Sequence, residues 1–197
     1  MAFPTGWTRY AAVTTPSAKV DSDQAGFPVL VGLSDTGLTA ARSDRGDVRF
    51  SSDTTGATQL PADYLGQWDD TKDSNTPKSW WVVLRDLSSS VDTAIYAWWG
   101  NASATLPVAS DTHGGQNAYD ANVLAYLPMR EDPSGSAPQM LDRTSNSNDA
   151  TTSGSMTSGD SVAGINGTAL DFDGADDGLV FTSTGPTVTS NSPRTYE

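Results

Sequence analysis

The sequence of 197 residues contains no cysteine and a single histidine, His113. Without cysteine, disulfide bonds, thiol catalysis and thiolate metal sites are excluded, and one histidine cannot form a His-rich metal site. No apolar run approaches the roughly 18 residues of a membrane-spanning helix. Residues 1–7 have neither a basic start nor an apolar stretch, so we expect no secretory signal peptide.

Basic residues are also scarce, since 11 Lys and Arg stand against 24 Asp and Glu and give a net charge of −13. Nucleic acid is therefore not an expected partner, because phosphate binding needs a basic patch that displaces counterions. The chain has only two Glu and three Lys but 48 Ser and Thr, 18 Gly and 11 Pro. Ser, Thr and Asp favour turns and strand edges over helices, so the composition predicts an all-β fold with many turns.

Short apolar segments between turn signals in the first half of the chain predict β-strands. These segments are Trp7–Val13, Phe27–Leu33, Asp47–Phe50, Ser79–Arg85 and Thr93–Trp99. Leu38–Arg42 holds two alanines and no helix breaker, so we expect one helical turn there. The stretch Asn101–Tyr119 is rich in Ala, Ser, Gly and Pro and is typical of a connector.

A second domain is predicted to begin near residue 121, which leaves residues 1–120 as the first. All six tryptophans lie between Trp7 and Trp99, so the composition changes near residue 100. The expected strands of the second domain are Asn122–Leu127, Thr168–Asp173 and Gly178–Phe181, and Thr144–Asp160 is expected to be a polar stretch.

Several segments of the first domain resemble a known family in their order. They are Arg42–Phe50 with its Gly-Asp-Val-Arg-Phe ending, Leu60-Pro61, Trp68-Asp69, Trp81–Leu87 and Thr93–Ala102. They resemble an uncharacterised β-sandwich domain family of marine phage proteins and bacterial surface proteins. In that family a Gly-Asp-Ile-Arg-Phe-type strand, a Leu-Pro step and a Tyr-Tyr-Gly-Asn ending follow one another. The fold class we predict is therefore an antiparallel, jelly-roll-like β-sandwich.

The second domain resembles the start of a concanavalin A-like, or laminin-G-like, lectin domain, which often follows the first family. Leu141–Ala150 resembles the Asp-Ser-Thr-Gly-Asn-Gly-Asn turn of such domains, and Gly167–Asp177 resembles their Gly-Ala-Leu-Phe-Asp-Gly strand and turn. A two-sheet sandwich takes about 100 residues, more than the chain holds after residue 121. We therefore expect this second sandwich, residues 121–197, to be incomplete and to belong to a longer polypeptide.

Two acidic groups are candidates for a cation site. The cluster Asp171, Asp173, Asp176 and Asp177 offers the carboxylates that Ca²⁺ prefers, although its spacing differs from an EF-hand. Asp173-Gly174 is also an ordinary strand-end turn, and this is the interpretation we favour, with no metal or other cofactor expected. Asp69, Asp70 and Asp73 are similarly typical of a solvated turn.

Catalysis finds little support in the sequence. Glycoside hydrolysis needs two carboxylates on either side of the bond, whereas the two glutamates, Glu131 and Glu197, lie in a Pro-containing turn and at the last residue. His113 lies in Thr-His-Gly-Gly without the context of a serine nucleophile, and we expect it to be an exposed loop residue. No catalytic residue is therefore predicted.

The tryptophans are the strongest candidates for external contacts. Trp68 lies in the acidic loop and is the best position for stacking a sugar ring. The pairs Trp80/Trp81 and Trp98/Trp99 lie on strands, where neighbouring side chains point to opposite faces. One member of each pair should lie in the core, and the other should be covered by a loop, a domain or another subunit, or remain exposed. We predict at least one of these four at a subunit or domain interface.

The resemblance implies a non-enzymatic structural protein of a phage virion: a tail fibre, spike or capsid-attached appendage that takes part in virion architecture and host-surface attachment. Its implied partners are other virion proteins, copies of itself, with a trimer favoured over a dimer, and a host-surface glycan. Virion proteins assemble in the host cytoplasm, which agrees with the expected absence of a signal peptide. The alternative is a carbohydrate-binding module of a bacterial surface or secreted protein, and therefore an extracellular location.

Overall fold

The structure, a computed structural model, describes residues 3–34, 36–67, 78–164, 167–182 and 185. Within these residues the regular structure consists of antiparallel strands and three short 3₁₀ helices, so the predicted all-β fold class is confirmed. The described part of the chain holds no helix long and apolar enough to cross a membrane. The chain forms two compact units: residues 1–120 with 163–167, and residues 121–162 with 168–197.

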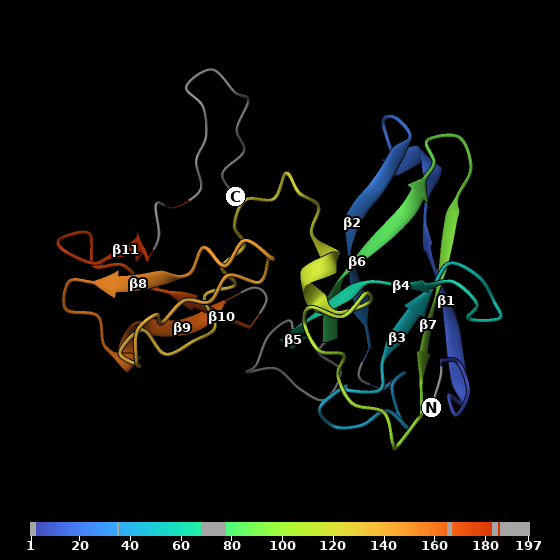
Figure 1. Cartoon of the computed structure of the whole chain (residues 1–197), viewed down its shortest axis with the longest axis horizontal. Coiled ribbons are helices and arrows are strands. Elements are labelled where there is room, and N and C mark those ends of the chain that lie inside the picture. The colour runs from blue at the N-terminus through green and yellow to red at the C-terminus, as the bar shows by residue number, and fades with distance from the viewer. Residues whose placement is uncertain (1–2, 35, 68–77, 165–166, 183–184, 186–197) are drawn as a thin grey trace. The chain divides into compact units, whose positions relative to one another are not determined.

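The first unit contains two sheets (Figure 1). Its strands are β1 (Arg9–Thr15), β2 (Gln24–Leu33), β3 (Arg49–Ser51), β4 (Gln59–Leu60), β5 (Ala62–Gln67), β6 (Lys78–Leu87) and β7 (Thr93–Trp99). One sheet has the order β1-β7-β3-β4 and the other has the order β2-β6-β5. The 3₁₀ helix η1 (Ser17–Lys19) follows β1, and η2 (Gly115–Ala118) contacts β5 and β6.

Both sheets contribute side chains to one hydrophobic core. Trp80 of β6 belongs to this core with 2% of its surface exposed, and its ring contacts those of Phe50 and Tyr64 at centroid distances of 5.8 and 5.0 Å. The other buried members are Val31, Leu38, Val48, Phe50, Leu60, Val82, Leu84, Leu87, Ile95, Ala97 and Trp99. Alternation along β6 and β7 places their inward residues here, which explains why these two strands are the most apolar segments of the sequence.

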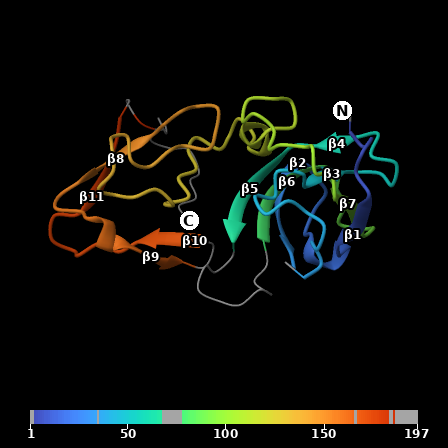
Figure 2. The same ribbon diagram turned by 90° about the horizontal axis from the view of Figure 1, so that it is seen from below.

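The predicted strands of this unit correspond to β1, β2, β3, β6 and β7, with shifts of a few residues at their ends. The structure adds β4 and β5. Leu38–Arg42 is not a helix: the residues form turns in which the Ala41 N–H donates to the Leu38 carbonyl (2.9 Å). Figure 2 shows β5 and β6 side by side in a second view, as their register requires.

Two short strand pairs follow residue 120 among the described residues. β8 (Ala150–Ser153) pairs with β11 (Gly178–Phe181), and β9 (Ser161–Gly164) pairs with β10 (Gly167–Leu170). The 3₁₀ helix η3 (Ser158–Asp160) precedes β9 and begins with a capping box at Thr157. The buried side chains include Pro133, Met140, Thr144 and Ala150.

The predicted strand Asn122–Leu127 is wrong, since these residues have no strand structure. Asparagine side chains satisfy the backbone carbonyls of this segment in place of a neighbouring strand. Asn146 donates to the Val123 carbonyl (3.0 Å), and Asn148 donates to the Leu124 carbonyl (2.7 Å). Asp142 accepts from the Tyr126 N–H (3.0 Å). The polar turn Leu141–Ala150, which resembles a lectin-domain motif, therefore has a structural role here. Its side chains form hydrogen bonds with the backbone of the segment Asn122–Leu127.

Candidate functional site

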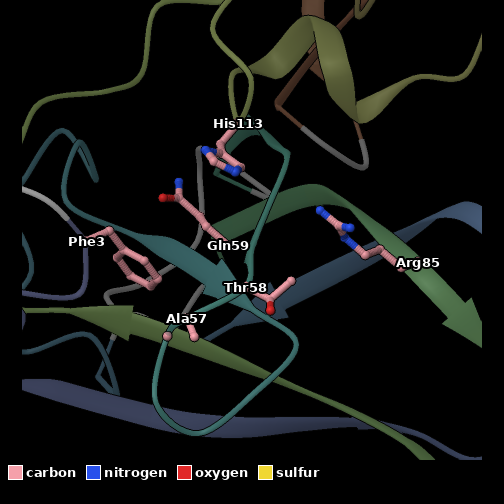
Figure 3. A pocket seen from close by; sticks show the side chains of 7 residues that line it. Phe3, Ala57, Thr58, Gln59, Arg85 and His113 are labelled. Atoms are coloured by element: carbon pink, nitrogen blue, oxygen red, sulfur yellow. The ribbon is translucent and has the colours of Figure 1, made fainter.

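The first unit has an open pocket of about 270 Å³ between the β3–β4 turn, β6 and the loop before η2 (Figure 3). Figure 3 shows the side chains of Thr58, Gln59, Arg85 and His113 around it, with the Phe3 ring at one side. Gly56 and Ala57 complete its lining. The residues come from four separate parts of the chain, which the two sheets bring together.

The polar side chains of the pocket have no hydrogen-bond or ion-pair partner among the described residues. This holds for the Thr58 hydroxyl, the Gln59 amide, the Arg85 guanidinium and the His113 imidazole. Thr58, Gln59 and His113 are half-buried, and Arg85 is exposed. Buried polar groups normally find partners, so these three half-buried side chains and the exposed Arg85 around one cavity are suited to hold a ligand.

Local turns place two of these residues. The Asp53 carboxylate accepts hydrogen bonds from the N–H groups of Thr55 (2.9 Å), Ala57 (3.1 Å) and Thr58 (2.7 Å), which closes the turn before β4. Asx turns of this kind are a common use of Asp in loops. The closed turn fixes the backbone at Thr58 and Gln59 and leaves both side chains at the pocket.

Two glycines permit the close contacts that shape the pocket. Gly56 has φ +71°, and a Cβ there would lie 2.8 Å from the Pro4 ring and 3.0 Å from the Phe3 ring. A Cβ on Gly114 would lie 2.1 Å from the Val108 carbonyl oxygen. Glycine is thus required on the turn that meets Phe3 and directly after His113.

The charges around His113 are positive. Partial burial lowers the pKa of His113 from its ordinary value, and the positive charges of Arg85 and Arg49 lower it further. Arg49 is itself half-buried. Its guanidinium donates to the Gly46 carbonyl (2.9 Å) and lies 5.6 Å from the Trp7 ring centroid. His113 is a loop residue, as predicted, but it is half-buried rather than exposed.

The pocket can bind and orient a ligand through cationic and hydrogen-bonding groups. The carboxylate pair used in glycoside hydrolysis is not among its lining residues. Sequence reasoning missed this site because none of its residues forms a motif with its sequence neighbours. The one available signal was His113 beside two glycines.

Three of the four paired tryptophans are buried within the chain itself. Trp80, Trp98 and Trp99 have 2%, 7% and 9% of their surfaces exposed, whereas Trp81 is half-buried. Trp80 and Trp99 belong to the core, as expected for the inward members of each pair.

N-terminal residues cover Trp98, the outward member on β7. Tyr10 of the neighbouring β1 stacks on its ring at 4.7 Å, and Phe3 meets it edge-on at 5.8 Å. The Trp98 indole N–H donates to the Ser51 hydroxyl at 2.7 Å. Trp98 is thus covered by residues of its own chain. The predicted interface role of Trp80, Trp81, Trp98 and Trp99 remains a prediction, and Trp81 is its best candidate.

Of the acidic cluster, Asp173, Asp176 and Asp177 lie together, with ligand atoms within 4.8 Å of one another. Asp171 is not part of this group. Asp173 accepts from the N–H of Ala175 (2.8 Å), and backbone N–H groups at Ala175, Asp176 and Asp177 lower its pKa. These bonds are those of a turn, so the geometry agrees with the strand-end interpretation while leaving carboxylate oxygens that could contact a cation.

Two other candidate groups, Trp68 and Asp69, Asp70 and Asp73, lie outside the described residues. Comparison of the chain with protein-family models gives no match, and neither curated proteins nor solved structures give one.

Proposed function

We propose that the chain is a non-enzymatic structural protein of a phage virion that takes part in virion architecture and host-surface attachment. The observation that carries the proposal is the order of the segments that resemble the phage and surface-protein family. Four of them, Arg42–Phe50, Leu60-Pro61, Trp81–Leu87 and Thr93–Ala102, lie on or beside β3, β4, β6 and β7. They thus belong to the two sheets around one core and form a coherent framework.

The architecture supports a role in presenting binding groups on a scaffold. Two sheets around a buried core of large side chains make a rigid scaffold, and loops between strands commonly carry binding groups on such scaffolds. In this chain the β3–β4 turn and the loop before η2 hold the pocket. The chain would act as a fibre, spike or capsid-attached appendage, with other virion proteins and copies of itself as partners.

The test is detection of the chain in purified particles of the phage whose genome encodes it. An antibody against the chain should label intact particles in negative-stain electron microscopy, and particles lacking the gene are the matched control. Labelling at a defined position supports the proposal. Particles that carry no chain overturn it.

The alternative is a carbohydrate-binding module of a bacterial surface or secreted protein, and the pocket with its unpartnered polar groups favours it. Here the chain should be absent from particles but bind glycans on an array in a saturable manner. A chain that is in particles but binds no glycan would instead be purely architectural.

A further inference from the structure

The pocket of the first unit differs in charge from the rest of the molecule. The whole chain has a net charge of −13, yet the charged side chain that lines the pocket is Arg85. His113 beside it has a lowered pKa and offers a neutral imidazole N–H near pH 7. The Asp53 carboxylate of the turn does not line the pocket, and it accepts from the N–H groups of Thr55, Ala57 and Thr58. Arg85 therefore gives the pocket a local positive charge within an acidic molecule, which favours a negatively charged group small enough to enter it.

The remaining lining residues suit a hydroxylated ligand. The Thr58 hydroxyl both donates and accepts, and the Gln59 amide offers two donors and an acceptor. The Phe3 ring offers an apolar surface, and its edge contacts with Trp7 (5.2 Å) and Trp98 (5.8 Å) hold it in place. The volume of about 270 Å³ is below the roughly 300–1,000 Å³ of pockets for drug-sized ligands, so the site fits one sugar unit.

We propose that this pocket binds a single acidic sugar residue, with its carboxylate on Arg85 and His113, its hydroxyls on Thr58 and Gln59, and its ring beside Phe3. Arginine is suited to the first contact because its planar guanidinium can donate two parallel hydrogen bonds to a carboxylate. The inference deepens the proposed function and rests on it: the acidic sugar would belong to the host-surface polysaccharide.

The experiment titrates the full chain with glucuronate, glucose, acetate and inorganic sulfate at low ionic strength and follows the amide NMR signals of Arg85 and His113. Glucuronate should shift both signals in a saturable manner. Glucose, which lacks the charge, and acetate, which lacks the hydroxyls, should each bind at least about tenfold more weakly. Equal binding of glucuronate and sulfate, or of glucuronate and acetate, would overturn the sugar assignment, and so would a failure of glucuronate to bind.

Two arginine variants distinguish binding in the pocket from a general effect of positive charge. Arg85→Gln should weaken glucuronate binding at least about tenfold, since a charge-assisted bidentate contact is lost. Arg9→Gln is the matched control, because Arg9 is also an exposed strand arginine but does not line the pocket. Unchanged urea unfolding midpoints show that both variants fold. An equal loss in both variants would overturn the proposal.

The outcome is distinguishable from that of the particle experiment. A chain found in particles that ignores glucuronate refutes the sugar site while leaving the virion role intact. A chain absent from particles that binds glucuronate refutes the virion role and supports the carbohydrate-binding alternative.

Discussion

At the scale of single residues, one buried carboxylate joins two separate segments of the first unit. Asp47 is completely buried, and its carboxylate accepts from the N–H groups of Arg42 (2.9 Å), Gly100 (2.8 Å) and Asn101 (3.1 Å). It thereby joins the loop before β3 to the end of β7. The segment Arg42–Phe50 therefore needs an aspartate at this position for a structural reason.

Replacement of this residue should be strongly destabilising. Asp47→Ala leaves three backbone N–H groups without their acceptor, and each unsatisfied buried donor costs about 1–3 kcal/mol. We expect a loss of at least about 3 kcal/mol in the free energy of unfolding, measured by urea denaturation. Asp86→Ala is the control, since Asp86 is exposed on β6, and should change the stability by less than about 0.5 kcal/mol. Similar effects in both variants would contradict the assigned role of Asp47.

The turn carboxylate Asp53 makes a pH-dependent contribution. Hydrogen bonds from the Thr55 hydroxyl, and then from the N–H groups of Thr58, Ala57 and Thr55, lower its pKa from the ordinary 3.8. Because the folded pKa is lowered, its contribution is fully present above about pH 4 and is lost as the pH falls through the folded value. Asp53→Asn should therefore be less stable than the parent at pH 7, and the difference should shrink below pH 3. A difference independent of pH would contradict this account.

The pocket could not be predicted from the sequence, because its residues are not neighbours along the chain. Phe3, Thr58, Arg85 and His113 are far apart in the chain and come together around the pocket in the folded first unit. Sequence patterns report neighbours along the chain, whereas a site assembled across two sheets depends on register and turn geometry.

At the scale of elements, the strands that could be predicted from the sequence were those rich in apolar residues. Thr93–Trp99 and Gly178–Phe181 were predicted with the observed bounds of β7 and β11. β8, Ala-Thr-Thr-Ser, has no alternating apolar pattern and lies within the segment expected to be a polar stretch. Asn122–Leu127 has an apolar pattern but is not a strand, because side chains of Asn146 and Asn148 take its carbonyls. Tertiary hydrogen bonds overrode the local pattern in that segment.

The end of β7 offers a test of element geometry. Gly100 has φ +86°, and a Cβ there would lie 2.4 Å from the Thr8 hydroxyl oxygen, which also donates to the Gly100 carbonyl. Gly100→Ala should thus cost the roughly 1–2 kcal/mol of a left-handed L-residue plus the displacement of Thr8. Gly26→Ala is the matched control, with φ +67° and open space. Thermal unfolding should show the larger loss for Gly100→Ala, and equal losses would mean that the steric contact is irrelevant.

At the scale of the whole molecule, Trp81 is the one of the four paired tryptophans that is half-buried rather than buried. Trp81 is opposite Leu30 in the register of β6 and β2, on the face away from Val31, Val82 and Trp80. Leu30 is 36% exposed, and Val83 on the same face is half-buried. We predict that another copy of the chain contacts this apolar face.

Association through this face should become stronger as the salt concentration rises. Each copy carries a net charge of −13, so repulsion opposes assembly at low ionic strength, and salt that screens it should strengthen an apolar contact. We expect light scattering to show a homo-oligomer, with a trimer favoured, whose dissociation constant falls as NaCl rises from about 0.05 to 0.5 M. Trp81→Ser should weaken the oligomer by the roughly 1.5–3 kcal/mol of a buried aromatic side chain. Val91→Ser is the control, because Val91 is 67% exposed in the loop after β6, and it should leave association unchanged. A monomer at all concentrations and salt levels, or equal effects of the two substitutions, would refute the predicted interface.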